Sequence, residues 1–254
     1  MKRIMAKDKT PKLRTVKKSV SAFPLNHFPK EFPFLLGKEL IYLLASKGKP
    51  ELEGSEWENI FANCIGADWK PSNVGLDDVV LGNTAWGAKT VKSSNPSTQK
   101  KVRLISGRNS PVYSYGETID TSSDPNAIGK LVLDIWNERV SAIREKFKHL
   151  RTIVLIKSND LQEVVVFEFE TIRYDNELFS WCWNKNNNLE GIELKTGQHR
   201  FTWQPHGSQF TIIEEVPNHS IVIKIKQPET LNKEQVLKAL GFDNTWITVY
   251  HKNE

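Results

Sequence analysis

Three charged residues in the segment GLDDVVLGNTAWGAKTVKSS could act together in chemistry on a phosphate. Asp77 and Asp78 open a short β-branched run, a Gly-Asn turn follows, and Lys89 lies in the middle of the next run. The pattern predicts a twisted β-hairpin that brings Asp78 within reach of Lys89. A carboxylate beside a lysine can hold Mg²⁺ and orient or deprotonate a water for attack on a phosphodiester. The alternative interpretation is ordinary surface charge on a hairpin.

The residues around this hairpin predict the elements that would hold it. A start signal at Ser55, apolar residues at helical spacing and a stop at Gly66 predict a helix over SEWENIFANCIG, and a longer helix is expected over roughly 125–150. Strands are expected at TIVLI and at VVVFEFE, whose Glu168 and Glu170 would form the polar face of an antiparallel strand. The Ser- and Gly-rich residues 93–117 are expected to form a polar loop.

The last third of the sequence has a different pattern. From about Tyr174, short alternating runs separated by Asn, Gly and Pro predict an antiparallel sheet, followed by a helix at NKEQVLKALG and a last strand at TWITVYH. Eight Lys or Arg residues against one Asp predict a flexible basic arm over 1–20. We therefore expect one α+β domain over 21–254, with a core over 21–173 and a β-rich part over 174–254.

The order helix, acidic strand, lysine strand, loop, helix, strand resembles the core of the PD-(D/E)xK nuclease superfamily, especially the type II restriction endonucleases. The resemblance is carried by LDDVVLG and WGAKTVK, with SEWENIFANCIG as the preceding helix, and it covers residues 50–170. It implies a restriction-endonuclease-like αβββαβ core with a mixed central sheet. It also implies that Asp78 binds Mg²⁺ and that Lys89 is the catalytic lysine.

Two positions depart from the pattern of that superfamily. The second acidic residue should lie two positions before the lysine, where this sequence has Gly87, and Asp77 stands where the family has a proline. In similar enzymes the preceding helix commonly lends a glutamate to the metal site, so Glu58 is predicted to be the second metal ligand. Asp77 and Glu138 are the alternatives.

Two polar stretches are predicted to contact DNA, because cations bind phosphates and Arg, Asn and Gln side chains can pair with base edges. The alternatives are a basic surface loop for the first stretch and a hairpin with core aromatics for the second. The predicted contacts are Arg103, Arg108 and Asn109 in the first stretch and Arg200, Gln204, His206 and Gln209 in the second.

Bulk composition narrows the class of protein. The formal net charge of +5 and the pI of about 9.0 suit a polyanionic partner. Two cysteines without a Cys-x-x-Cys pair argue against a disulfide scaffold and a zinc ribbon. No apolar run approaches the roughly 18 residues of a membrane helix, so we expect a cytoplasmic protein that does not bind membranes.

These observations and the resemblance together predict a Mg²⁺-dependent, sequence-specific endonuclease that cuts double-stranded DNA and leaves 5′-phosphates. Cutting both strands of a symmetric site would most simply use a homodimer. Two alternatives stay open: a sequence-specific DNA-binding protein without catalysis, and a repair or structure-specific nuclease.

Overall fold

A computed structural model describes residues 19–71, 74–116 and 123–251 of the chain, so the predicted basic arm lies outside the described residues except for its last two positions. The described part has an α+β architecture with two sheets, which confirms the expected class. None of its helices combines the length and apolar character needed to cross a membrane. The α-helices are α1 (Phe32–Lys47), α2 (Gly54–Ile65), α3 (Pro111–Tyr115), α4 (Pro125–Lys146) and α5 (Lys233–Ala239). The short 3₁₀ turns are η1 (Pro96–Thr98), η2 (Asn176–Leu178) and η3 (Asn244–Trp246).

The first sheet is mixed and contains the predicted hairpin. Its strand order is β1-β2-β3-β5-β6-β11, with β3 and β5 parallel and every other neighbouring pair antiparallel. Val79 pairs with Trp86 across the hairpin, and Lys89 pairs with Val154 of the parallel neighbour. The strands are β1 (Asp68–Trp69), β2 (Val79–Leu81), β3 (Thr84–Lys92), β5 (His149–Lys157), β6 (Glu163–Glu170) and β11 (Ile221–Lys224).

The second sheet is antiparallel throughout, with the order β4-β10-β9-β8-β7. Its first strand corrects the prediction of a polar loop over 93–117. Val102 and Leu104 are buried while their neighbours Lys101 and Arg103 are exposed, so β4 has a strand's alternation despite its loop-like composition. The strands are β4 (Lys101–Arg108), β7 (Phe179–Trp183), β8 (Leu189–Glu193), β9 (His199–Gln204) and β10 (Gln209–Glu215).

The two sheets exchange strands along the chain, so the predicted division at 173/174 does not separate them. Strand β4 comes from the first part of the chain but belongs to the second sheet, and β11 comes from the last third but pairs with β6. Val102 and Leu104 of β4 also pack against Val154 and Phe167 of the first sheet. The buried contacts therefore make β4 the link between the sheets.

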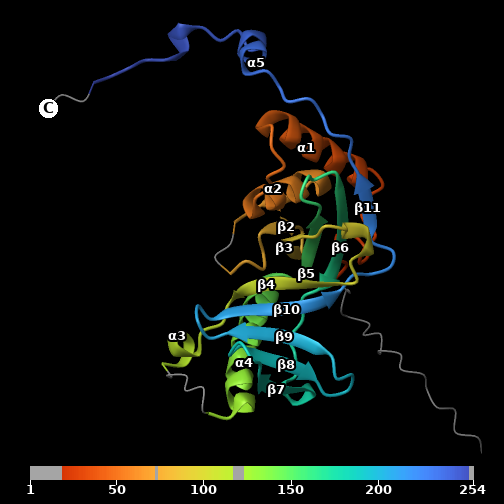
Figure 1. Cartoon of the computed structure of the whole chain (residues 1–254), viewed down its shortest axis with the longest axis vertical. Helices are drawn as coiled ribbons and strands as arrows, with labels where there is room; N and C mark the ends of the chain where they lie inside the picture. Colours follow the sequence, from red (N-terminus) through yellow and green to blue (C-terminus); the bar gives the residue numbers. More distant parts are fainter. Residues whose placement is uncertain (1–18, 72–73, 117–122, 252–254) are drawn as a thin grey trace, which may run out of the picture.

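Helices cover the remaining apolar faces (Figure 1). Helices α1 and α2 pack on one face of the first sheet, where Trp57 and Phe61 meet Trp86. Helix α4 lies against the second sheet, and its apolar stripe packs on Trp181 and Phe210. The predicted helices over SEWENIFANCIG and roughly 125–150 are thus confirmed as α2 and α4, and the hairpin lies between their two cores.

The C-terminal residues differ from the prediction in one respect. Helix α5 is present where NKEQVLKALG predicted it. The predicted last strand at TWITVYH is wrong, because η3 occupies its start and residues 247–251 pair with no strand. In Figure 1 this region extends away from the body of the molecule, so a neighbouring strand is not within reach in a single copy.

Candidate active site

The hairpin places Asp78 and Lys89 on adjoining strands. Asp78 comes one residue before the Val79–Trp86 pair and is only 3% exposed. Its Oδ2 accepts a hydrogen bond from the backbone N–H of Ala88 at 3.3 Å, which fixes the carboxylate against the lysine strand. The Lys89 amine donates to the carbonyl oxygen of Gly75 at 3.3 Å.

The charges around Lys89 act on one another. Burial lowers the pKa of the Lys89 amine, the negative charges of Asp78 and Glu58 oppose that shift, and the positive charge of Arg139 adds to it. We call Asp78, Glu58, Lys89 and Arg139 the Lys89 site. Lys89 itself is half-buried, so its side chain keeps some contact with water.

Among the three acidic residues considered as the second ligand, Glu58 is the one whose charge contributes to the shift at Lys89. Helix α2 positions it: a capping box between Glu53 and Glu56 starts the helix, and the indole N–H of Trp69 donates to Glu58 Oε2 at 3.1 Å. Glu138 is exposed on α4. Its position leaves Glu58 as the better partner for Asp78.

Gly87 stands where the superfamily has its second acidic residue, and the packing around it explains why. A Cβ atom at this position would lie 2.8 Å from the carbonyl oxygen of Gly75 and 3.1 Å from the Cα of Leu76. The backbone that leads into Asp78 fills the space that a side chain would need. A side chain at position 87 therefore has no room in this fold.

Replacing Gly87 with alanine is expected to destabilise the fold by about 1–3 kcal/mol. The new Cβ atom would clash with backbone atoms of Gly75 and Leu76, which cannot move away as a flexible side chain could. Urea denaturation measures this change in the free energy of unfolding. Gly54→Ala is the control: nothing lies within 4 Å of its Cβ position, so a change below about 0.5 kcal/mol is expected. Equal stability of Gly87→Ala and the wild type would contradict the close approach.

Arg139 is a member of the site that the sequence analysis did not single out. Its guanidinium donates to the carbonyl oxygens of Val74 at 2.5 Å and Ser106 at 2.6 Å, and to Asn109 Oδ1 at 3.1 Å. It thereby ties the segment before Asp78 to the end of β4. Its position in the sequence could have indicated this role. Arg139 lies three residues after Trp136 on the apolar stripe of α4, where a charged residue needs a hydrogen-bond partner.

The side chains around Lys89 that could act as metal ligands are carboxylates. Within residues 19–71, 74–116 and 123–251, no group of three or more His, Cys, Asp or Glu side chains comes together. Mg²⁺ is typically held by one or two carboxylates, with waters and substrate phosphates completing its shell. Asp77 Oδ1 is in addition buried without a hydrogen-bond partner beside Asp78. The donor set is hard oxygen, which suits Mg²⁺.

The first predicted DNA-contact stretch is split by the structure. Arg103 and Arg108 are exposed on β4, and Arg103 also donates to Thr202 Oγ1 at 2.9 Å. Asn109 is fully buried, and its amide donates to the carbonyl oxygen of Val132 while accepting from Arg139. Its side chain is out of reach of a base edge, so we remove Asn109 from the predicted contacts.

The second stretch forms the predicted hairpin of β9 and β10, but not a free ribbon, because both strands have neighbours on both sides. His206 is exposed at the turn, with Gln204 and Gln209 half-buried at the strand ends. Arg200 is already engaged: its guanidinium donates to Glu214 at 2.5 Å and lies over the Tyr174 ring. The turn therefore offers His206, Gln204 and Gln209 to a partner, whereas Arg200 is held inside the sheet.

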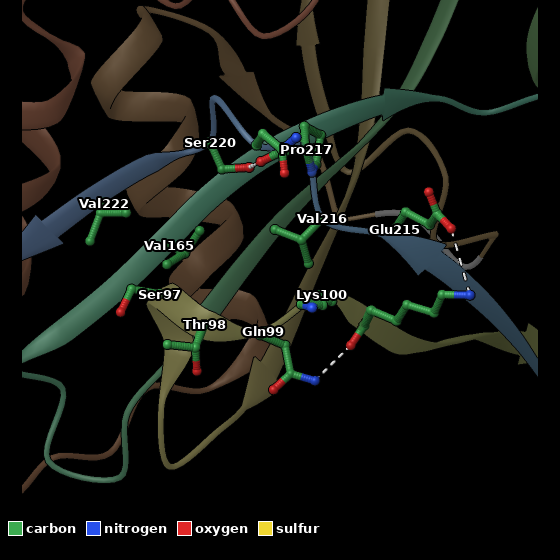
Figure 2. Close-up of a pocket in the computed structure, with 12 residues that line it drawn as sticks. Ser97, Thr98, Gln99, Lys100, Val165, Glu215, Val216, Pro217, Ser220 and Val222 are labelled. Atoms are coloured by element: carbon green, nitrogen blue, oxygen red, sulfur yellow. Dashed lines mark hydrogen bonds and ion pairs between the residues drawn. The ribbon is translucent and has the colours of Figure 1, made fainter.

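A groove of about 650 Å³ lies elsewhere, between η1, β6 and the segment joining β10 to β11 (Figure 2). None of Asp78, Glu58 or Lys89 lines it. The Lys101 amine there pairs with Glu215 at 3.6 Å, and Gln99 donates to the Lys101 carbonyl at 2.7 Å. Its Lys101, Gln99 and Glu215 already bond within the protein, and we place the candidate chemistry at the Lys89 site.

What the Lys89 site can do follows from its charges. Two carboxylates can hold a divalent cation, and a desolvated ammonium can bind a phosphate oxygen or orient a water. Arg139 holds the loop that shapes the site. Comparisons of this chain with protein-family models, with curated proteins and with solved structures find no match.

Proposed function

We propose that this protein is a Mg²⁺-dependent endonuclease that cuts double-stranded DNA at specific sequences, in the manner of type II restriction endonucleases. Asp78 and Glu58 would hold the metal, and Lys89 would act at the scissile phosphate. The observation that carries the proposal is the half-buried Lys89 amine, which bonds to the Gly75 carbonyl oxygen and whose pKa responds to the negative charges of Asp78 and Glu58. Removing an ammonium from water is unfavourable, and such a group is a candidate for function when it lies beside charged partners.

Each residue of the Lys89 site has a distinct role in this proposal. A bound Mg²⁺ would neutralise charge on the scissile phosphate. The Lys89 amine would orient the attacking water and offset the negative charge that grows on the phosphate. The N–H of Ala88 and the indole of Trp69 orient the two carboxylates, and Arg139 fixes the backbone before Asp78. The products would carry 5′-phosphates.

The surface around the second sheet supports a nucleic-acid substrate. Strand β4 exposes Lys101, Arg103 and Arg108, and the β9–β10 turn exposes His206. Arg139 bonds both to the end of β4 and to the segment before Asp78. Phosphate contacts on β4 would therefore be structurally linked to the proposed site of cleavage. Within this proposal, Arg103 and Arg108 bind phosphates, and Gln204, His206 and Gln209 pair with base edges.

The test is cleavage of supercoiled plasmid DNA with Mg²⁺ and with EDTA. We expect discrete bands with Mg²⁺ and none with EDTA. Glu58→Gln should reduce the rate by at least about 100-fold, because removing one group that stabilises transition-state charge has an effect of that order. Glu138→Gln is the matched control, a carboxylate on a helix that does not contribute to the pKa shift of Lys89, and it should cut normally.

One observation favours a second function, a sequence-specific DNA-binding protein without catalysis: among the described residues two carboxylates act on Lys89, and Gly87 occupies the position of the superfamily's second acid. In that case DNA would bind in EDTA and no metal would support cleavage. A smear of products on plasmid DNA would instead favour a repair or structure-specific nuclease.

A further inference from the structure

Helix α1 carries apolar side chains on both of its faces. Its inner face, with Leu36, Leu40 and Leu44, is buried against the first sheet. The opposite stripe leaves Phe34 70% exposed and Tyr42 66% exposed, with Ile41 between them also exposed. Apolar residues on a second face of a helix are typical of a face that another element covers. The outer stripe of α1, Phe34, Ile41 and Tyr42 with the exposed Lys38 between the two rings, is therefore an uncovered and largely apolar surface.

A second uncovered apolar surface begins at the end of the same helix. The C-terminal arm, residues 228–251, leaves the body where the Leu231 N–H donates to the carbonyl oxygen of Ala45 at 2.9 Å. From there α5 lies beyond α1 and the chain runs away from the two sheets (Figure 1). The exposed large apolar side chains of the arm are Leu231, Val236, Leu240, Trp246, Ile247, Val249 and Tyr250.

The arm has regular local structure, which holds its exposed side chains in defined positions. Asn232 caps α5 by accepting from the Gln235 N–H at 3.1 Å, and Asp243 caps η3 by accepting from the Thr245 N–H at 2.8 Å. Residues 247–251 are rich in β-branched and aromatic types but pair with nothing in this copy. The arm therefore carries strand-forming and aromatic residues that are without a packing partner in a single copy.

We propose that the C-terminal arm packs on the outer stripe of α1 of a second copy of this chain, with the second copy's arm on the first copy's α1. Each chain carries one arm and one stripe, so a two-fold axis satisfies both surfaces at once. The arm is anchored at the end of its own α1 and leads away from it, which leaves that stripe for another chain. This inference does not depend on the proposed nuclease activity.

The area available is sufficient for a stable dimer. Trp246 is 62% exposed and Tyr250 87% exposed, similar to the two aromatic rings of the stripe. A fully covered aromatic side chain buries about 150–250 Å². At these exposed fractions the four rings of each copy offer roughly 400–700 Å², at least about half of the roughly 800 Å² per partner of a standard interface. The aliphatic side chains of the arm add to this area.

The first test is the mass of the full-length protein in solution, measured by light scattering after gel filtration. We expect twice the chain mass of 29.1 kDa for the wild type. Tyr42→Glu and Trp246→Glu should each weaken the dimer by at least roughly 30-fold, as expected for a charge placed at an aromatic anchor. Leu194→Glu changes an equally exposed apolar residue outside both surfaces and should leave the dimer intact. A monomeric wild type would overturn the proposal.

The second test asks which chain the arm contacts. In a Cys182→Ser background, which removes the exposed cysteine and leaves the buried Cys64, one chain carries Tyr42→Cys and the other Trp246→Cys. Oxidation of the mixture should give a covalent dimer. If both changes in a single chain give instead a cross-linked monomer, the arm folds onto its own helix and the proposal is wrong.

Discussion

Replacing Lys89 with methionine is expected to reduce DNA cleavage by at least about 10²–10³-fold while DNA affinity changes little. In the proposed function the lysine would act on charge that develops at the phosphate, whereas DNA affinity would come mostly from the exposed cations of β4. The free energy of unfolding of the same variant should change by less than about 1 kcal/mol, because relief from the desolvation of the ammonium is offset by the loss of its interactions with Asp78 and Glu58. Single-turnover cleavage, filter binding and urea denaturation measure the three quantities.

Lys92→Met is the matched control, since Lys92 lies on the opposite strand face and is exposed. It should leave cleavage and stability unchanged. Loss of stability together with loss of cleavage in Lys89→Met would mean that Lys89 is structural. Near-normal cleavage in that variant would end the assignment of the Lys89 site.

The pH dependence of stability and cleavage in the wild type and in Lys89→Met follows from the lowered pKa of Lys89. Below that pKa both the folded and the unfolded chain carry the proton, and the folded state bears the unfavourable desolvation. As pH rises from the lowered pKa towards the ordinary 10.5, only the folded state loses the proton, so stability increases over that window. Cleavage should fall over the same window, because the positive charge is lost. Lys89→Met should show neither change.

The elements with strong periodicity were predictable from the sequence. Apolar spacing and terminal glycines predicted α2 and α4, and the Gly-Asn turn predicted the hairpin of β2 and β3. Local signals are sufficient there because each element buries one face against a partner close in the fold. Strand β4 was missed because its exposed Lys101 and Arg103 and its Ser and Gly residues outweigh Val102 and Leu104 in composition.

The sequence predicted only those residues of the candidate site that lie close together along the chain. Asp78 and Lys89 lie eleven residues apart on one hairpin, so their proximity follows from strand pairing. Arg139 reaches the site from α4 across a long sequence separation, and nothing in the local pattern specifies which backbone it will bond. The requirement for glycine at position 87 was also not predictable from the local sequence. The backbone that excludes a side chain there is that of Gly75 and Leu76, which belong to another segment.

A buried ion pair that the sequence pattern did not predict lies in the first sheet. Glu168 was expected on the polar face of a strand, but it is fully buried. Arg151 donates to its Oε1 at 2.8 Å, and the Trp86 indole donates to its Oε2 at 2.7 Å. Asn26 bonds the same residue through its backbone N–H and its side chain, so the segment before α1 is fixed to β6.

Arg151→Met is therefore expected to lower the free energy of unfolding by about 3–5 kcal/mol, because it leaves a buried carboxylate without its cation. Urea denaturation measures this loss. Adding Glu168→Gln should recover much of it, since the double variant no longer buries an unpaired charge. A single variant as stable as the wild type would show that the pair contributes nothing.

The pH dependence of Arg151→Met identifies the cause of its instability. Burial raises the pKa of the Glu168 carboxyl, while the Trp86 indole and Arg151 act in the opposite direction. Removing Arg151 raises the pKa further, so the folded state then binds a proton more tightly than the unfolded state. Stability from a raised carboxyl pKa is fully present at low pH and is lost as pH rises through the folded pKa. Arg151→Met should therefore lose more stability at about pH 8 than at about pH 5. A loss that is the same at both values would assign the instability to lost packing around Phe23, over whose ring the Arg151 guanidinium lies at 5.7 Å.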